Sequence, residues 1–103
     1  MELTDKNFKS TITDNKVVMV DFWAEWCGPC RVLAPTMDSL GKDFNGKLVI
    51  GKVNVDNNPT LSTINKVRTI PTVIVYKNGV EVERLVGVRD KTFYTDKLNY
   101  YLN

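Results

Sequence analysis

The hydrophobic positions of the chain form strand-like runs separated by helical stripes. The run 17–23 is apolar, β-branched and aromatic except for Asp21, which is typical of a strand covered on both faces. Further strands are predicted at 48–55, 72–76 and 81–86, and Asn78 with Gly79 between the last two is a strong hairpin signal. The pattern therefore predicts a central strand at 17–23 and an antiparallel pair towards the C-terminus.

Four helices are predicted around these strands. Thr4 or Asp5 caps the first, Asp90 caps the last, and Pro59 after an Asx cap begins another. The apolar stripes of these three helices are Phe8 and Ile12, then Leu61, Ile64 and Val67, and finally Tyr94, Leu98 and Tyr101. Strands alternating with helices, followed by a hairpin and a last helix, predict an α/β protein with a mixed sheet and helices on both faces.

The fourth helix, from Pro29 to about Phe44, directly follows the most informative segment of the chain. Its apolar stripe is Leu33, Met37, Leu40 and Phe44. Pro35 is expected to bend it, because proline removes an amide donor and crowds the preceding turn. Asn45 and Gly46 are expected to end it.

Length and composition indicate one domain spanning 1–103, since 103 residues with 43% hydrophobic content suffice for a single packed core. The formal net charge of +2 offers no surplus for nucleic acid or anionic lipid. Neither a signal-peptide pattern nor an apolar run approaching 18 residues is found. We therefore expect a cytoplasmic protein with no nucleic-acid or membrane partner.

The chain has two cysteines and no histidine, and the cysteines frame the segment Cys27-Gly28-Pro29-Cys30 at the predicted strand-to-helix junction. Residues three apart at a helix start lie roughly 5–6 Å apart, which matches the Cα separation of a disulfide. Cys27 precedes the proline that opens the helix, so its sulfur is expected to face free amides and the positive end of the helix dipole. This position predicts that Cys27 is the nucleophile, and that the more buried Cys30 resolves the intermediate.

Three other interpretations compete with redox chemistry. A zinc site needs about four ligands, and the chain supplies two cysteines plus carboxylates. An inert structural disulfide closing so short a loop restricts the unfolded chain only slightly. Two unrelated free cysteines are the third interpretation, which the junction and the Gly-Pro pair between them disfavour. Redox chemistry is the interpretation we favour.

The segment from Trp23 to Cys30, with Asp21 before it and Ile70, Pro71 and Thr72 after it, resembles the thioredoxin family over the whole chain length. The resemblance implies a thioredoxin fold, with a single mixed five-stranded sheet of three parallel strands plus an antiparallel hairpin, flanked by four helices. Arg31 departs from the lysine that many members carry, which preserves the charge.

The resemblance also implies roles for individual residues. Asp21, predicted to share a buried strand face with Met19 and Trp23, is implied to be the proton acceptor and donor for Cys30, because burial raises the pKa of a carboxyl. Lys52 is implied to be its partner. The Ile70–Pro71 bond is implied to be cis and to lie against the disulfide. The implied substrate surface comprises Trp26, Gly28, Pro29, Ile70, Pro71, Val86 and Gly87.

The function implied is that of a general protein disulfide reductase, which acts on disulfide-containing proteins and is recycled by thioredoxin reductase. We expect a monomer with no bound cofactor and no metal. Two alternatives stay open: a disulfide donor or isomerase on the same fold, which histidine between the cysteines would favour, and an interaction or chaperone module with idle thiols.

Overall fold

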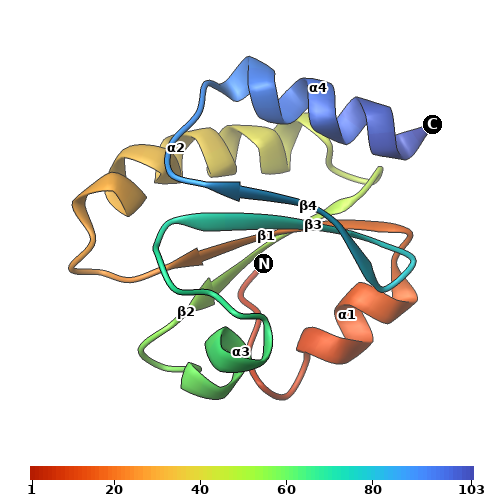
Figure 1. Ribbon diagram of the computed structural model, residues 1–103. Helices are drawn as coiled ribbons and strands as arrows, with labels where there is room; N and C mark the ends of the chain where they lie inside the picture. The colour runs from red at the N-terminus through yellow and green to blue at the C-terminus, as the bar shows by residue number, and fades with distance from the viewer.

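A computed structural model describes all residues, 1–103, and shows a mixed sheet between two layers of helices (Figure 1). The strands are β1 Val17–Trp23, β2 Val49–Asn54, β3 Thr72–Lys77 and β4 Val80–Val86. The helices are α1 Phe8–Asp14, α2 Gly28–Asp43, α3 Pro59–Ile64 and α4 Lys91–Leu102. No helix is both long enough and apolar enough to span a membrane.

The strand order across the sheet is β2-β1-β3-β4. β1 pairs in parallel with β2 and antiparallel with β3, and β3 and β4 form the hairpin predicted from Asn78 and Gly79. Both hairpin residues have positive φ, 55° and 81°, which suits asparagine and glycine. In Figure 1, α2 and α4 lie on one side of the sheet, and α1 and α3 lie on the other.

The expectation of five strands is wrong, because the sheet has four. The N-terminal segment runs parallel to β2 but makes only an isolated bridge between Glu2 and Lys52. Leu3 N donates to Lys52 O at 2.8 Å and Lys52 N donates to Met1 O at 2.9 Å. The chain then turns, with Thr4 N donating to Asn7 Oδ1 at 2.7 Å, so the segment is too short to continue as a strand.

Two expectations about the short helices also differ from the structure. α1 begins at Phe8 after Asn7, not after Thr4 or Asp5, because residues 5–7 form a turn. Ile64 was expected on the inner side of α3, but its side chain is 68% exposed. α3 has only six residues and its one buried residue is Leu61, so the helix ends before a second turn faces the core.

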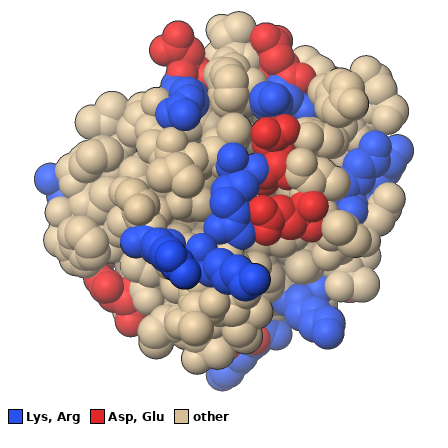
Figure 2. Space-filling view, viewed as in Figure 1, with Lys and Arg blue, Asp and Glu red and all other residues tan.

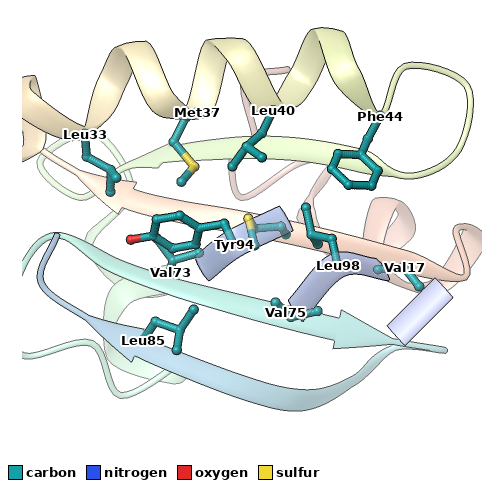
Figure 3. Close-up of a cluster of buried hydrophobic side chains, with 11 residues drawn as sticks. Val17, Leu33, Met37, Leu40, Phe44, Val73, Val75, Leu85, Tyr94 and Leu98 are labelled. Atoms are coloured by element: carbon teal, nitrogen blue, oxygen red, sulfur yellow. The ribbon is translucent and has the colours of Figure 1, made fainter. Parts of the chain in front are cut away.

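The sheet separates two hydrophobic cores because successive residues of β1 point to opposite faces. Val18, Val20 and Phe22 pack with the α1 and α3 side. Val17 and Met19 pack with the predicted stripe of α2, Leu33, Met37, Leu40 and Phe44, and with Tyr94 and Leu98 of α4 (Figure 3). By the same alternation Asp21 lies on the α2 and α4 face.

The packing of Leu3 against β2 gives a stability prediction. A Cβ added at Gly51 lies 2.5 Å from Leu3 Cδ1 and 2.9 Å from Leu3 Cγ, and Leu3 is fully buried. We expect Gly51→Ala to lower the free energy of unfolding by about 1–3 kcal/mol, because the buried leucine has to shift. The measurement is urea unfolding of the oxidised protein.

Gly41 is the matched control for this substitution. It lies inside α2, and an added Cβ meets no heavy atom within 4 Å. Gly41→Ala is expected to raise the free energy of unfolding by about 0.5–1 kcal/mol, because alanine favours the helix. Equal effects at the two glycines would contradict the steric explanation.

On the face shown in Figure 2, several basic side chains lie side by side near the centre, and acidic side chains adjoin them. Ion pairs join Arg84 to Glu81 at 2.8 Å and Lys97 to Glu83 at 3.4 Å.

A candidate dithiol active site

Cys27 and Cys30 form a disulfide at the N-terminus of α2, with their Cα atoms 5.2 Å apart. Cys27 is the N-cap residue, with an extended backbone, and α2 begins at Gly28 with Pro29 in its first turn. Extended backbone followed by proline is the local geometry that starts a helix abruptly. The separation predicted from the Cys-Gly-Pro-Cys spacing is therefore confirmed.

The surroundings of the two sulfurs differ more in polarity than in exposure. Cys27 Sγ accepts a hydrogen bond from the backbone N–H of Cys30 at 3.2 Å. It also lies 3.8 Å from the carbonyl oxygen of Ile70. The relative exposures are 4% for Cys27 and 2% for Cys30, a difference too small to assign roles. The asymmetry between the sulfurs is therefore electrostatic, because only Cys27 occupies the cap position where free amides favour a thiolate.

Asp21 is a buried carboxylate close to the dithiol end of the sheet. It is 1% exposed, and neither carboxylate oxygen has a hydrogen-bond partner. Burial raises its pKa from the ordinary 3.8 to about 6, and the positive charge of Lys52 partly opposes this rise. A carboxyl with this pKa exchanges its proton near neutral pH.

Lys52 lies opposite Asp21 in the parallel register of β1 and β2. The Lys52 Nζ lies 4.8 Å from the centre of the Trp23 ring. Lys52 and Asp21 form no ion pair within 4.0 Å. Lys52 therefore influences Asp21 through its field rather than through a direct contact.

The Ile70–Pro71 peptide bond is cis, as the resemblance implied. Ile70 packs against the small buried cluster of Ala24, Cys27 and Cys30. Gly87 N donates to Pro71 O at 2.9 Å, and Val86 pairs in register with Thr72. The structure thus brings Ile70 and Pro71 beside the disulfide and places Val86 and Gly87 next to Pro71.

Trp26 is 68% exposed, and its indole N–H donates to Asp56 Oδ2 at 2.8 Å. Sequence reasoning missed Asp56, although a signal was present. Parallel strands end at the same edge of a sheet, so the loop after β2, which carries Asp56, had to meet the loop after β1, which carries Trp26. The hydrogen bond fixes the orientation of the indole beside the disulfide loop.

A hollow of about 320 Å³ opens between Trp26 and Ile70. Sequence reasoning did not include its other lining residues, which are Val55, Pro59, Ser62, Thr63, Val67 and Arg68. A larger pocket of about 720 Å³ lies between α1 and α3 and contains no residue of the dithiol loop. No group of three or more potential metal ligands comes together in the chain.

The two cysteines form a disulfide at the N-terminus of a helix, beside a cis-proline, in an α/β fold with a four-stranded sheet. These features define a thiol–disulfide oxidoreductase. The thioredoxin family model matches residues 1–99. A thioredoxin from Chlorobaculum thiosulfatiphilum is 43% identical over 102 residues, which covers 98% of this chain and 94% of that protein. The chain belongs to the thioredoxin family.

Two further comparisons agree with this assignment. A chloroplastic M-type thioredoxin from Spinacia oleracea is 41% identical over 103 residues, covering 99% of this chain and 57% of that protein. The structure of a mutant thioredoxin from Halobacterium salinarum superposes with a TM-score of 0.92 at 31% identity, covering 100% of this chain and 90% of the other. Sequence and fold thus match along nearly the whole chain.

Proposed function

We propose that the chain is a general protein disulfide reductase in which Cys27 attacks and Cys30 resolves. The observation that carries the proposal is the N-cap position of Cys27, whose sulfur accepts the Cys30 N–H at the amide-rich tip of α2. Stabilising negative charge on this sulfur lowers its pKa and raises the fraction of nucleophilic thiolate.

The reaction consists of two exchanges. The Cys27 thiolate attacks one sulfur of a substrate disulfide, forms a mixed disulfide and releases the other substrate sulfur as a thiolate, which takes up a proton. The Cys30 thiol then loses its proton to Asp21 and attacks Cys27, which releases the second substrate sulfur. The substrate gains two electrons, and the Cys27–Cys30 disulfide forms.

Asp21 is suited to this role because it is buried on the face of the sheet that α2 covers, and its pKa of about 6 lies close to neutrality. Lys52 favours the ionised carboxylate, which keeps part of the Asp21 population able to accept a proton. We assign Lys52 a positioning role only.

We assign substrate binding to the surface around the disulfide formed by Trp26, Gly28, Pro29, Ile70, Pro71, Val86 and Gly87. Trp26 and Val86 are exposed, and Ile70 is half-buried beside Cys27. An extended substrate segment can lie across this apolar surface and pair with backbone next to Pro71. Family membership supports thioredoxin reductase as the electron donor, and we propose a monomeric, cytoplasmic protein.

Trapping with Cys30→Ser tests the mechanism. This variant is expected to accumulate mixed disulfides with a substrate such as insulin, because Cys27 can still attack but no second thiol can resolve. Non-reducing electrophoresis and mass spectrometry identify the adduct and the cysteine that carries it. If Cys30→Ser reduced substrate disulfides without forming an adduct, the roles assigned to Cys27 and Cys30 would be contradicted.

Equilibration with glutathione buffers distinguishes a reductant from the alternative functions. A reduction potential well below that of the glutathione couple is expected for a reductase, whereas one near or above it indicates a disulfide donor or isomerase. Full biological activity of a Cys27→Ser and Cys30→Ser double variant would instead support an interaction or chaperone module.

A further inference from the structure

Tyr94 carries a polar group that the proposed mechanism leaves unused. Tyr94 belongs to α4 and its side chain is fully buried in the core, where its hydroxyl has no hydrogen-bond partner. A buried hydroxyl without a partner costs roughly 1–3 kcal/mol, and a phenylalanine fills nearly the same space without that cost. Packing alone therefore does not explain why position 94 carries a tyrosine rather than a phenylalanine.

The hydroxyl is directed along the core towards the dithiol end of the molecule. Tyr94 belongs to the same core cluster as Leu33 of α2 and Val73 of β3. In Figure 3 its oxygen points towards the Leu33 end of α2, away from Phe44. Leu33 lies one turn after Cys30, so the phenol points towards the start of the helix that carries the disulfide.

Asp21 is the other buried group without partners on this face. It lies directly opposite Val73 in the β1–β3 register, and Val73 belongs to the same core cluster as Tyr94. Both carboxylate oxygens and the phenolic oxygen lack partners, and the three are the only such atoms in the chain apart from Ser62 Oγ. Two buried polar groups on one face of the sheet are suited to share one buried water.

Several charged or titratable groups surround this pair. Lys52 faces Asp21 from β2, and Cys30 lies on α2 above the same face of the sheet. Burial raises the pKa of Tyr94, the backbone of Arg89 lowers it, and Asp21 raises it further. The positive charge of Arg89 also lowers the pKa of Tyr94. The influence of Asp21 on Tyr94 agrees with their proximity on the shared face.

We propose that Tyr94 is a positioning residue for Asp21. The Tyr94 hydroxyl donates a hydrogen bond to one buried water, which in turn donates to the Asp21 carboxylate. The phenol keeps its own proton and contacts neither substrate nor sulfur. Donation favours the ionised form of Asp21 and orients the carboxylate that accepts the Cys30 proton. The inference rests on the proposed role of Asp21 in the resolving step.

The test compares Tyr94→Phe with Tyr101→Phe. Tyr101 is the matched control, since it lies on the same helix and its hydroxyl contacts Glu83 and the Val82 carbonyl at the surface. Carboxyl-carbon NMR of the oxidised proteins gives the titration of Asp21. Tyr94→Phe is expected to raise the Asp21 midpoint by about 0.5–1 pH unit, and Tyr101→Phe is expected to leave it in place.

A second measurement needs no change at Tyr94. The ring-carbon resonance next to the Tyr94 hydroxyl is expected to shift with the same midpoint as Asp21 in the parent protein, and to lose that step in Asp21→Asn. An unchanged Asp21 midpoint in Tyr94→Phe, or a Tyr94 resonance that does not move through the midpoint, overturns the inference.

The rate of mixed-disulfide resolution separates this inference from the proposed function. If Asp21→Asn leaves the pH dependence of resolution unchanged, the role of Asp21 as a proton acceptor is wrong, whatever the NMR shows. If Asp21→Asn abolishes the pH dependence while Tyr94→Phe leaves its midpoint in place, only the inference about Tyr94 fails.

Discussion

Replacing Cys27 by serine is expected to reduce disulfide-reductase activity by more than about three orders of magnitude. A serine hydroxyl stays protonated at the tip of α2, so no thiolate is available to attack a substrate disulfide. The hydrogen bond from Cys30 N and the helix dipole then have no negative charge to stabilise. Insulin reduction, driven by dithiothreitol or by a thioredoxin reductase, measures the loss.

Cys30→Ser is the matched control for this prediction. Both variants lack the Cys27–Cys30 disulfide, so any effect of the disulfide on stability is common to them. Only Cys30→Ser retains the Cys27 thiolate, which attacks the substrate disulfide. We expect a single burst of substrate cleavage with Cys30→Ser and none with Cys27→Ser. A burst from Cys27→Ser alone would assign the nucleophile to Cys30 and contradict the electrostatic argument.

Asp21→Asn is expected to have the second largest effect, and to change stability and activity in opposite directions. In the parent protein the pKa of Asp21 rises from 3.8 to about 6, because burial disfavours the carboxylate. Below about pH 3.8 the Asp21 carboxyl is protonated in both the folded and the unfolded state, so its burial costs no stability through ionisation. Between about pH 4 and 6 only the folded state retains it, and parent stability falls as pH rises.

Above pH 6 the loss of folding stability caused by burying the Asp21 charge reaches its full value. A pKa rise of about two units corresponds to about 3 kcal/mol. An uncharged amide removes most of this penalty. We expect the free energy of unfolding of oxidised Asp21→Asn to exceed that of the parent by up to about 3 kcal/mol at pH 7, and the two proteins to converge near pH 3.5. Urea unfolding at several pH values measures the difference.

The same substitution is expected to slow the resolving step about 10–100-fold at pH 7, because proton transfer from Cys30 to a positioned base is lost. Glu25→Gln is the control, since it also removes one carboxylate near the dithiol but at an exposed position. A stability difference that is independent of pH would show that burial of the Asp21 charge is not its cause.

The arrangement of helices and strands followed largely from hydrophobic periodicity. The apolar run around Asp21 became β1, and the stripe from Leu33 to Phe44 became the inner face of α2. Asn78 and Gly79 placed the hairpin because their backbone requirements are local. Elements whose signal is carried by many periodic positions were thus predicted within a few residues of their observed bounds.

The errors lie in short elements, whose bounds depend on a few contacts rather than on a long periodic pattern. Asn7, rather than Thr4, precedes α1 because its side chain accepts from the Thr4 amide and stabilises a turn. The short length of α3 leaves Ile64 exposed although it fits the stripe. The N-terminal bridge to Lys52 depends on register with a distant strand, which local patterns do not contain.

The candidate site was predictable where a motif or an incongruous residue marked it. The spacing of Cys27 and Cys30 predicted their pairing, and Asp21 was conspicuous as a carboxylate within an apolar strand. Asp56 went unrecognised because it is an ordinary acidic residue until the fold places it beside Trp26. The hydroxyl of Tyr94 went unrecognised because tyrosine in a helical stripe first suggests packing.

The two sulfur atoms at the start of α2 are largely enclosed, with 4% and 2% of their residues' surface exposed. Sulfur exchange requires three sulfur atoms nearly in line, so an incoming disulfide has to approach Cys27 along a narrow path. A partner whose cystine lies in a mobile stretch of chain can adopt that approach, whereas one locked inside a rigid domain cannot. We therefore expect the protein to discriminate among disulfides chiefly by the local flexibility of the partner, and only weakly by its amino-acid sequence.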